Sequence, residues 1–170
     1  MKAILTILFI SVFHIIVNAQ ANNQRAQNPD ELGTLVFKSF QNENYMAFEN
    51  CIFTENDCEI MCNKANATDS VKAIVVKQMQ GLTERIRRLS KENFQEIVEK
   101  GKQKGIDWPH SKLSKTFFEI RKDHNIESCD IVLLCECKDT IFGIKLDNCS
   151  KSDAWLMMGQ VAIKFKKDKI

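Results

Sequence analysis

The spacing of the apolar residues changes once along this chain, at Trp108-Pro109, and this change limits the folds open to it. Before this point, apolar residues recur every three or four positions, as they do on one face of an α-helix. After it, they alternate with polar residues, as in a strand with one buried face. Helices followed by strands predict an α+β fold, with N-terminal helices packed on a four-stranded antiparallel sheet.

Three or four helices are expected before Trp108. The first begins at Asn28-Pro29, since Asn can cap a helix and Pro suits its first position. A break over residues 41–44 precedes a short second helix, and Thr54 opens a third. The longest helix follows a cap at Thr68 and runs to about Lys100. We expect its apolar face to lie on the sheet, a face made by Val71, Val75, Met79, Leu82 and Ile86.

Four strands are expected over residues 116–122, 129–137, 140–146 and 154–165. A two-residue turn at Lys138-Asp139 would place Cys135 opposite Phe142 and turn both toward the helices. The same register places Cys129 opposite Asn148 and turns Cys149 to the other face. It therefore predicts that no Cys129–Cys149 disulfide forms.

Residues 1–19 have the features of a secretory signal peptide. Lys2 supplies a positive charge, a short apolar run follows, and small residues allow cleavage after Ala19 or Ala21. A membrane anchor is the alternative, and the polar interruptions of the run oppose it. We expect an exported protein, periplasmic or extracellular, with no membrane span after cleavage. Residues 20–27 would be a disordered leader and residues 28–170 a single α+β domain.

The charge balance argues against nucleic acid as a partner, because 24 Lys and Arg face 22 Asp and Glu. No phosphate loop, dinucleotide-binding glycine motif, nucleophile elbow or zinc-protease helix occurs in the sequence. We therefore expect no cofactor.

A resemblance to a known superfamily rests on four short segments. The first is the helix break Asn42-Glu43-Asn44-Tyr45, and the others are residues 105–108, 145–149 and 154–158. Together they resemble exported bacterial proteins of the nuclear transport factor 2-like (cystatin-like) superfamily. The resemblance implies a cone of helices within a curved sheet, often with a pocket. Some members are isomerases or dehydratases, others bind ligands, and others form homodimers through the sheet.

The seven cysteines allow three interpretations, one of which is a structural disulfide formed after export. Cys135 and Cys137 share one face of a strand, and with Cys62 from a helix they could form a thiolate metal site. The simpler interpretation is that cysteines fill core positions as small apolar residues. No metal is therefore expected, and these three residues are the weak candidates for one.

Two Asp–His pairs are the candidates for acid–base catalysis: Asp107 with His110, and Asp123 with His124. Both segments are more simply polar connections between elements.

Three large aromatic side chains could line a ligand pocket, and the simpler interpretation is that such lone aromatics near strands pack in the core. These pocket candidates are Trp108, Trp155 and Phe142.

The sequence thus predicts an exported, non-catalytic binding or interaction module whose partner is an unknown small molecule or protein. The alternative is a small pocket enzyme of the isomerase or dehydratase type that uses an Asp/His pair. The binding module and the enzyme would be discriminated by whether the pocket is open and whether a carboxylate or His side chain points into it.

Overall fold

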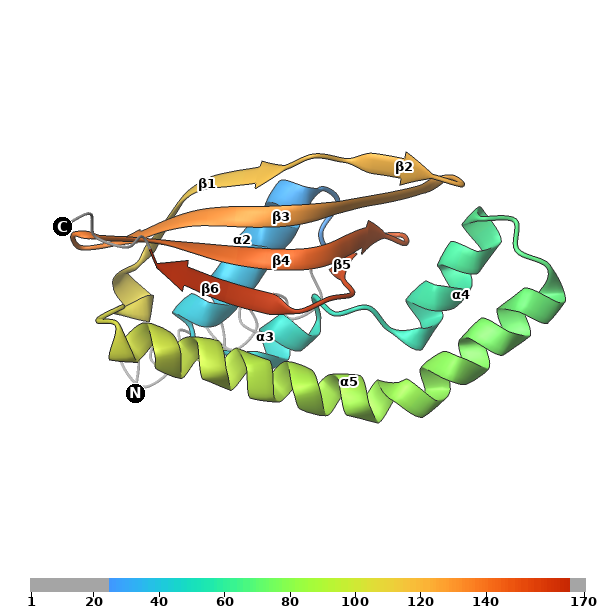
Figure 1. Cartoon of the computed structure of the whole chain (residues 1–170), viewed down its shortest axis with the longest axis horizontal. Helices are drawn as coiled ribbons and strands as arrows, with labels where there is room; N and C mark the ends of the chain where they lie inside the picture. Colours follow the sequence, from blue (N-terminus) through green and yellow to red (C-terminus); the bar gives the residue numbers. More distant parts are fainter. Residues whose placement is uncertain (1–24, 166–170) are drawn as a thin grey trace, which may run out of the picture.

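Helices precede strands in the computed structural model, which describes residues 25–165 (Figure 1). The expected signal peptide and most of the expected leader lie outside the described residues. Arg25 and Ala26 of that leader do contact the domain, since Ala26 is buried and pairs with Trp155. These residues therefore belong to the folded chain.

The α+β class is confirmed, and the elements follow the order that the apolar spacing predicts. The helices are α2 (Pro29–Gln41), α3 (Tyr45–Glu49), α4 (Glu55–Lys64), α5 (Asp69–Gln103) and the 3-10 turn η2 (Trp108–His110). The strands are β1 (Lys112–Phe118), β2 (Arg121–Asp123), β3 (Ile126–Cys137), β4 (Thr140–Lys151), β5 (Trp155–Met157) and β6 (Val161–Phe165).

The predicted helix starts are confirmed by their capping contacts. The side chain of Asn28 accepts a hydrogen bond from the backbone N–H of Glu31 at 2.9 Å. Thr54 and Asp57 form a reciprocal capping box at the start of α4, and Thr68 caps α5. Each cap satisfies a backbone N–H that lacks a partner inside the helix, which is why these helices begin at these residues.

The sheet has six antiparallel strands where the sequence predicts four, because both of its outer rows are interrupted. β1 and β2 both pair with β3, and β5 and β6 both pair with β4. The second interruption lies at Gly159, whose N–H donates to the carbonyl oxygen of Asp147. A Cβ atom at Gly159 would lie 2.5 Å from that oxygen, so only glycine fits this approach.

The predicted register is confirmed for the half of the β3–β4 hairpin nearest its turn. Cys135 lies opposite Phe142, and Ile131 lies opposite Leu146. All four side chains are buried toward the helices, as predicted.

Beyond Ile131 the register shifts, and here the prediction is wrong. A β-bulge places two residues of β4, Asp147 and Asn148, opposite Asp130 alone. Asn148 adopts a left-handed conformation with φ of 52°, and its N–H donates to the Asp130 carboxylate at 3.0 Å. The extra residue turns Cys149 back to the inner face, directly opposite Cys129.

The main core lies between the open, curved sheet and the helices α2, α3 and the C-terminal half of α5 (Figure 1). Phe40 of α2 stacks on Phe94 of α5, with ring centroids 5.0 Å apart. Trp108 packs at the end of α5 and donates its indole N–H to the carbonyl of Val98.

The N-terminal half of α5 does not lie on the sheet, which corrects the predicted packing. Val71 and Leu82 are 46% and 41% exposed, whereas Phe94 and Ile97 are buried. Val75 and Met79 instead pack on a small second cluster formed by Phe53, Cys58 and Leu156. The helix of 35 residues is roughly 50 Å long, so it extends beyond strands that span roughly 40 Å (Figure 1).

Candidate functional site

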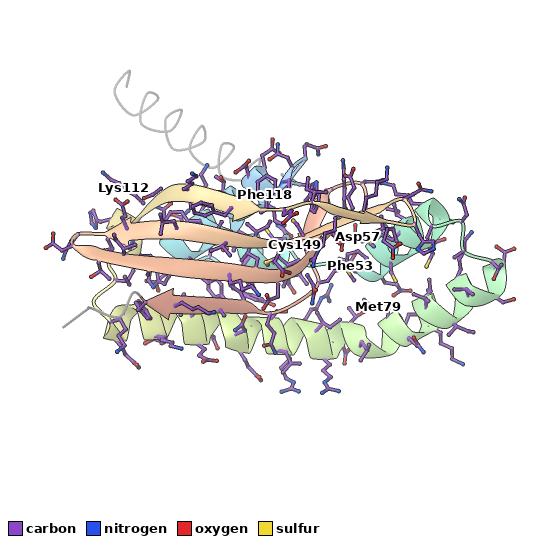
Figure 2. All side chains as sticks on the ribbon, turned by 45° about the horizontal axis from the view of Figure 1, so that its top comes forward. Phe53, Asp57, Met79, Lys112, Phe118 and Cys149 are labelled. Carbon is purple, nitrogen blue, oxygen red and sulfur yellow. The ribbon has the colours of Figure 1, made fainter. Side chains whose placement is uncertain are left out.

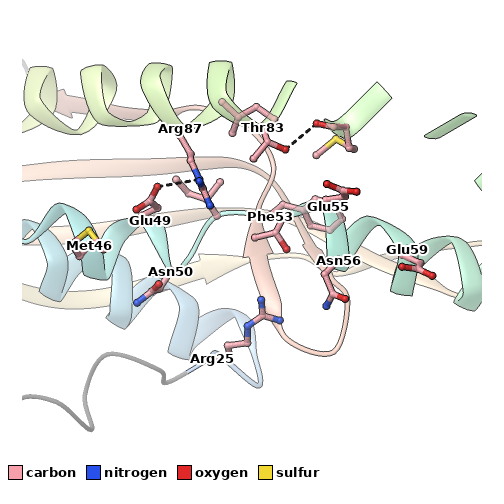
Figure 3. A pocket seen from close by; sticks show the side chains of 14 residues that line it. Arg25, Met46, Glu49, Asn50, Phe53, Glu55, Asn56, Glu59, Thr83 and Arg87 are labelled. Carbon is pink, nitrogen blue, oxygen red and sulfur yellow. Dashed lines mark hydrogen bonds and ion pairs between the residues drawn. The ribbon is translucent and has the colours of Figure 1, made fainter. Parts of the chain in front are cut away.

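A cleft of about 880 Å³ lies between the middle of α5 and the segment that contains α3 and the start of α4 (Figure 3). It lies toward the α4 end of the molecule, away from Lys112 at the start of β1 (Figure 2). The residues that line it are Arg25, Met46, Glu49, Asn50, Ile52, Phe53, Thr54, Glu55, Asn56, Glu59, Met79, Thr83, Ile86 and Arg87.

One wall of the cleft is α5, and the other is the α3–α4 segment. Two hydrogen bonds connect these walls. The hydroxyl of Tyr45 in α3 donates to the carbonyl oxygen of Arg87 at 3.0 Å. Farther toward the start of α5, the Gln80 amide donates to the carboxylate of Glu55 at 2.7 Å. Between these two contacts, Thr83 and Arg87 of α5 line the cleft across from Glu49 and Phe53 (Figure 3).

The floor of the cleft is anchored to the sheet by backbone hydrogen bonds. Phe53 donates its N–H to the carbonyl of Met157 in β5 at 2.9 Å, and Met157 donates to Cys51 at 2.8 Å. Ile52 forms a parallel bridge with the same strand residue. This wall is therefore joined to the sheet by hydrogen bonds, whereas the opposite wall is a helix segment whose Met79 packs on the small cluster that includes Leu156 of β5.

The cleft combines apolar side chains with charged ones. Met79 and Ile86 extend from α5 as half-buried side chains, and Phe53 lies buried across from Met79. Arg87 pairs with Glu49 at 3.5 Å. Glu59 is exposed and forms no ion pair with another described residue.

A buried carboxylate supports one side of the cleft. Both oxygens of Asp57 accept hydrogen bonds from the guanidinium of Arg25, at 2.9 and 3.3 Å. Ser152, in the connection between β4 and β5, donates to the same carboxylate at 2.8 Å. Burial by itself would raise the pKa of Asp57, but the hydrogen bonds from Thr54, Ser152 and Arg25 outweigh it and lower the pKa.

The two predicted Asp–His pairs form, but neither lines the cleft. His110 Nδ1 lies 3.1 Å from Asp107 in the connection from α5 to β1. His124 Nδ1 lies 2.7 Å from Asp123 in the β2–β3 turn, where His124 has a left-handed φ of 45°. The two pairs lie at opposite ends of the first row of the sheet (Figure 1), and both histidines are exposed.

The three predicted pocket aromatics are core residues. Trp108, Trp155 and Phe142 are each 1% exposed, and none of them lines the cleft. Trp108 meets Phe142 edge to face, with centroids 5.7 Å apart. Their size and spacing are explained by packing between the helices and the sheet.

The three metal candidates are not brought together. Cys135 is buried opposite Phe142, and burial raises the pKa of its thiol to about 12. Cys137 accepts a hydrogen bond from the backbone N–H of Asp107 at 3.2 Å, and Cys62 lies on α4. Within residues 25–165, no group of three or more His, Cys, Asp or Glu side chains could hold a metal ion.

Sequence reasoning missed the cleft because it assigned the apolar side of α5 to the sheet. One signal was available. The predicted helix was longer than any predicted strand, so part of its apolar side had to find another partner or stay open to solvent.

Comparisons of the chain with protein-family models, curated proteins and solved structures find no match. Among the helices of residues 25–165, none combines the length and apolar character that crossing a membrane requires.

Proposed function

We propose that this protein is an exported, non-catalytic binding module and that its ligand occupies the cleft between α5 and the α3–α4 segment. The observation that carries the proposal is the makeup of the cleft. Apolar side chains from two walls face a common space, and charged side chains surround them. Sites that bind ligands commonly combine an apolar lining with a few polar groups.

The charges of the cleft favour a basic and apolar ligand. Three carboxylates, Glu49, Glu55 and Glu59, line it together with two guanidinium groups. Arg87 already pairs with Glu49, and Arg25 pairs with Asp57, so both positive charges are compensated within the protein. The thioethers of Met46 and Met79 can adapt to different apolar side chains. We infer that the ligand is a protein segment with an apolar side chain flanked by Lys or Arg.

The enzyme alternative has less support. An acid–base pair must lie within hydrogen-bond reach of a bound substrate. The Asp107–His110 and Asp123–His124 pairs instead lie on exposed connections outside the cleft. Binding is therefore the function that the arrangement of these residues supports best.

The outer face of the sheet suggests a second mode of interaction, the homodimer implied by the superfamily resemblance. Phe117 and Val132 lie opposite each other on β1 and β3, and Ile141 of β4 lies on the same face, opposite Glu136. These side chains are 46%, 39% and 41% exposed. Equilibrium sedimentation of the protein and of Val132→Glu would test this proposal, which predicts a dimer that the substitution dissociates.

The relationship to the nuclear transport factor 2-like superfamily remains a proposal that rests on the sequence motifs. An open, curved sheet with helices on one face is compatible with it.

Selection from a displayed library of random peptides tests the binding proposal. We expect the full chain to enrich peptides in which an apolar residue is flanked by basic ones. Glu59→Lys should weaken their binding at least about tenfold, because it reverses a charge that is uncompensated in the cleft. Glu136→Lys, an exposed substitution on β3 outside the cleft, is the matched control and should leave binding unchanged. Equal affinities for both variants and the unaltered protein would exclude the cleft as the binding site.

A further inference from the structure

Two buried thiols face each other across the central strand pair. The bulge at Asp147-Asn148 places Cys149 of β4 directly opposite Cys129 of β3. Both residues are 0% exposed and lie within the main core. Figure 2 marks Cys149 on the sheet near the strand end that faces α4.

This placement meets the backbone requirement for a disulfide. Residues directly opposite each other in an antiparallel pair have Cα atoms about 4.5–5.5 Å apart. Disulfides span Cα separations of about 4.4–6.8 Å, so no strand movement is needed to connect these two residues. Directly opposite residues also send their side chains to the same face of the sheet.

We propose that Cys129 and Cys149 form a structural disulfide that closes the bulged end of the β3–β4 hairpin. The bond forms by exchange with a disulfide-bearing oxidant, either a protein or a small molecule. The Sγ–Sγ bond between the cysteines forms, the disulfide of the oxidant breaks, and the two protons pass to its two thiols. Export to an oxidising compartment, which residues 1–19 predict, would supply such an oxidant.

The disulfide forms before the hairpin is covered by the helices. In the folded protein both thiols are fully buried in the main core, where an oxidant cannot approach them. Burial also raises the pKa of Cys129 to about 11, which suppresses the thiolate that exchange requires. Once formed, the bond is equally protected from reduction.

The other core cysteines are poorer partners. Cys135 and Cys137 are two residues apart on one strand, with Cα atoms roughly 6.5–7 Å apart, at the limit for a disulfide. Cys51 is another buried cysteine of the main core, and it adjoins β5. However, Met157 of β5 lies between Cys51 and Cys149. Its N–H donates to the carbonyl of Cys51, and Met157 is also the strand partner of Cys149.

Non-reducing peptide mapping of the oxidised full chain tests the proposal. Digestion after Lys and Arg and before Asp separates Cys129, in the peptide 123–129, from Cys135 and Cys137, in the peptide 130–138. We expect peptide 123–129 joined to peptide 147–151, and the joined species should disappear after reduction. Recovery of both peptides with alkylated thiols would overturn the proposal. So would Cys149 joined to the peptide 39–56, which carries Cys51.

A thermal measurement supplies an independent readout. Reduction of the unaltered protein while it is unfolded, followed by refolding in reductant, should lower its melting temperature by roughly 5–15 °C, the shift expected when a crosslink of this loop length is lost. Cys149→Ala should abolish this dependence on reductant. Cys135→Ala is the matched control, because it removes an equally buried thiol whose strand partner is Phe142. It should retain the shift, and a Cys149→Ala protein that still shows the full shift would contradict the assignment.

Discussion

Gly101 shows how one missing side chain positions the end of the long helix against the sheet. A Cβ atom at this position would lie 2.5 Å from the ring of Trp108. The indole can therefore pack directly on the helix backbone, donate to the carbonyl of Val98, and stack against Phe40 at 5.5 Å. Trp108 is therefore the side chain at which α2, α5 and the sheet pack against one another.

We expect Gly101→Ala to destabilise the protein by about 1–3 kcal/mol, because the added methyl group overpacks a buried contact. Gly81→Ala is the matched control in the same helix, since no atom lies within 4 Å of its added Cβ. It should stabilise the protein by about 0.5–1 kcal/mol through helix propensity. Urea denaturation of both variants measures these changes, and equal effects would show that the Trp108 contact is not tight.

Asp57 should contribute to stability in a pH-dependent way. Its pKa is lowered in the folded protein, so its contribution is complete above the unfolded value of about 3.9 and is lost as pH falls through the folded pKa. Asp57→Asn should cost about 1–3 kcal/mol at neutral pH, because Arg25, Thr54 and Ser152, which donate to this buried carboxylate, lose an ionised acceptor.

The difference in free energy of unfolding between Asp57→Asn and the unaltered protein should become smaller as pH falls below about 4. Denaturation at a series of pH values measures it, with Asp153→Asn as the control at an exposed carboxylate. A pH-independent difference would mean that the charge of Asp57 is not what stabilises the fold.

At the scale of elements, α5 has two halves with different partners. Its C-terminal half buries Phe94, Ile97 and Val98 against the sheet. Its N-terminal half packs only on α4 and the small cluster around Phe53, and it forms one wall of the cleft. One uninterrupted helix thus joins the core to the candidate binding site.

Alanine substitutions in the two halves of α5 should lower the free energy of unfolding by different amounts. Ile97→Ala should destabilise by about 2–5 kcal/mol, the range for a buried aliphatic side chain. Leu82→Ala should change stability by less than about 0.5 kcal/mol, because Leu82 is 41% exposed. Chemical denaturation measures both, and a large loss for Leu82→Ala would place that half of the helix on the sheet after all.

At the scale of the whole molecule, the described chain has one large core and one small one. The large core joins α2, α3, the end of α5 and the sheet, whereas the small one joins α4 and the first half of α5 to Leu156 of β5. Regions with few buried apolar contacts open at lower free energy than the main core. The part of the molecule that carries the cleft is therefore the part best able to adjust to a ligand.

Hydrogen exchange followed by mass spectrometry should detect this division. We expect amides in residues 94–103 and in β3 and β4 to exchange slowest, and amides in α4 and residues 69–85 to exchange faster. Peptides from the two halves of α5 serve as internal controls for each other, since both are helical. Uniform protection along α5 would show that the two cores unfold as one unit.

Several features were predictable from the sequence because they depend on neighbouring residues. Asn28, Thr54 and Thr68 start helices through side chains that reach backbone groups three residues away. The alternation of apolar residues in β3 and the tight turn at Lys138-Asp139 were sufficient to identify the buried face near that turn. The α+β class follows from the change of apolar period at Trp108.

The features that decide function depended on tertiary structure. The bulge at Asn148 is stabilised by the Asp130 carboxylate on another strand, so strand spacing alone did not reveal it. Likewise, the apolar side of α5 has the same helical spacing along both halves, and only the length of the sheet decided which half was buried. Capping and periodicity act within a few residues, whereas the cleft and the Cys129–Cys149 pairing arise where distant segments meet.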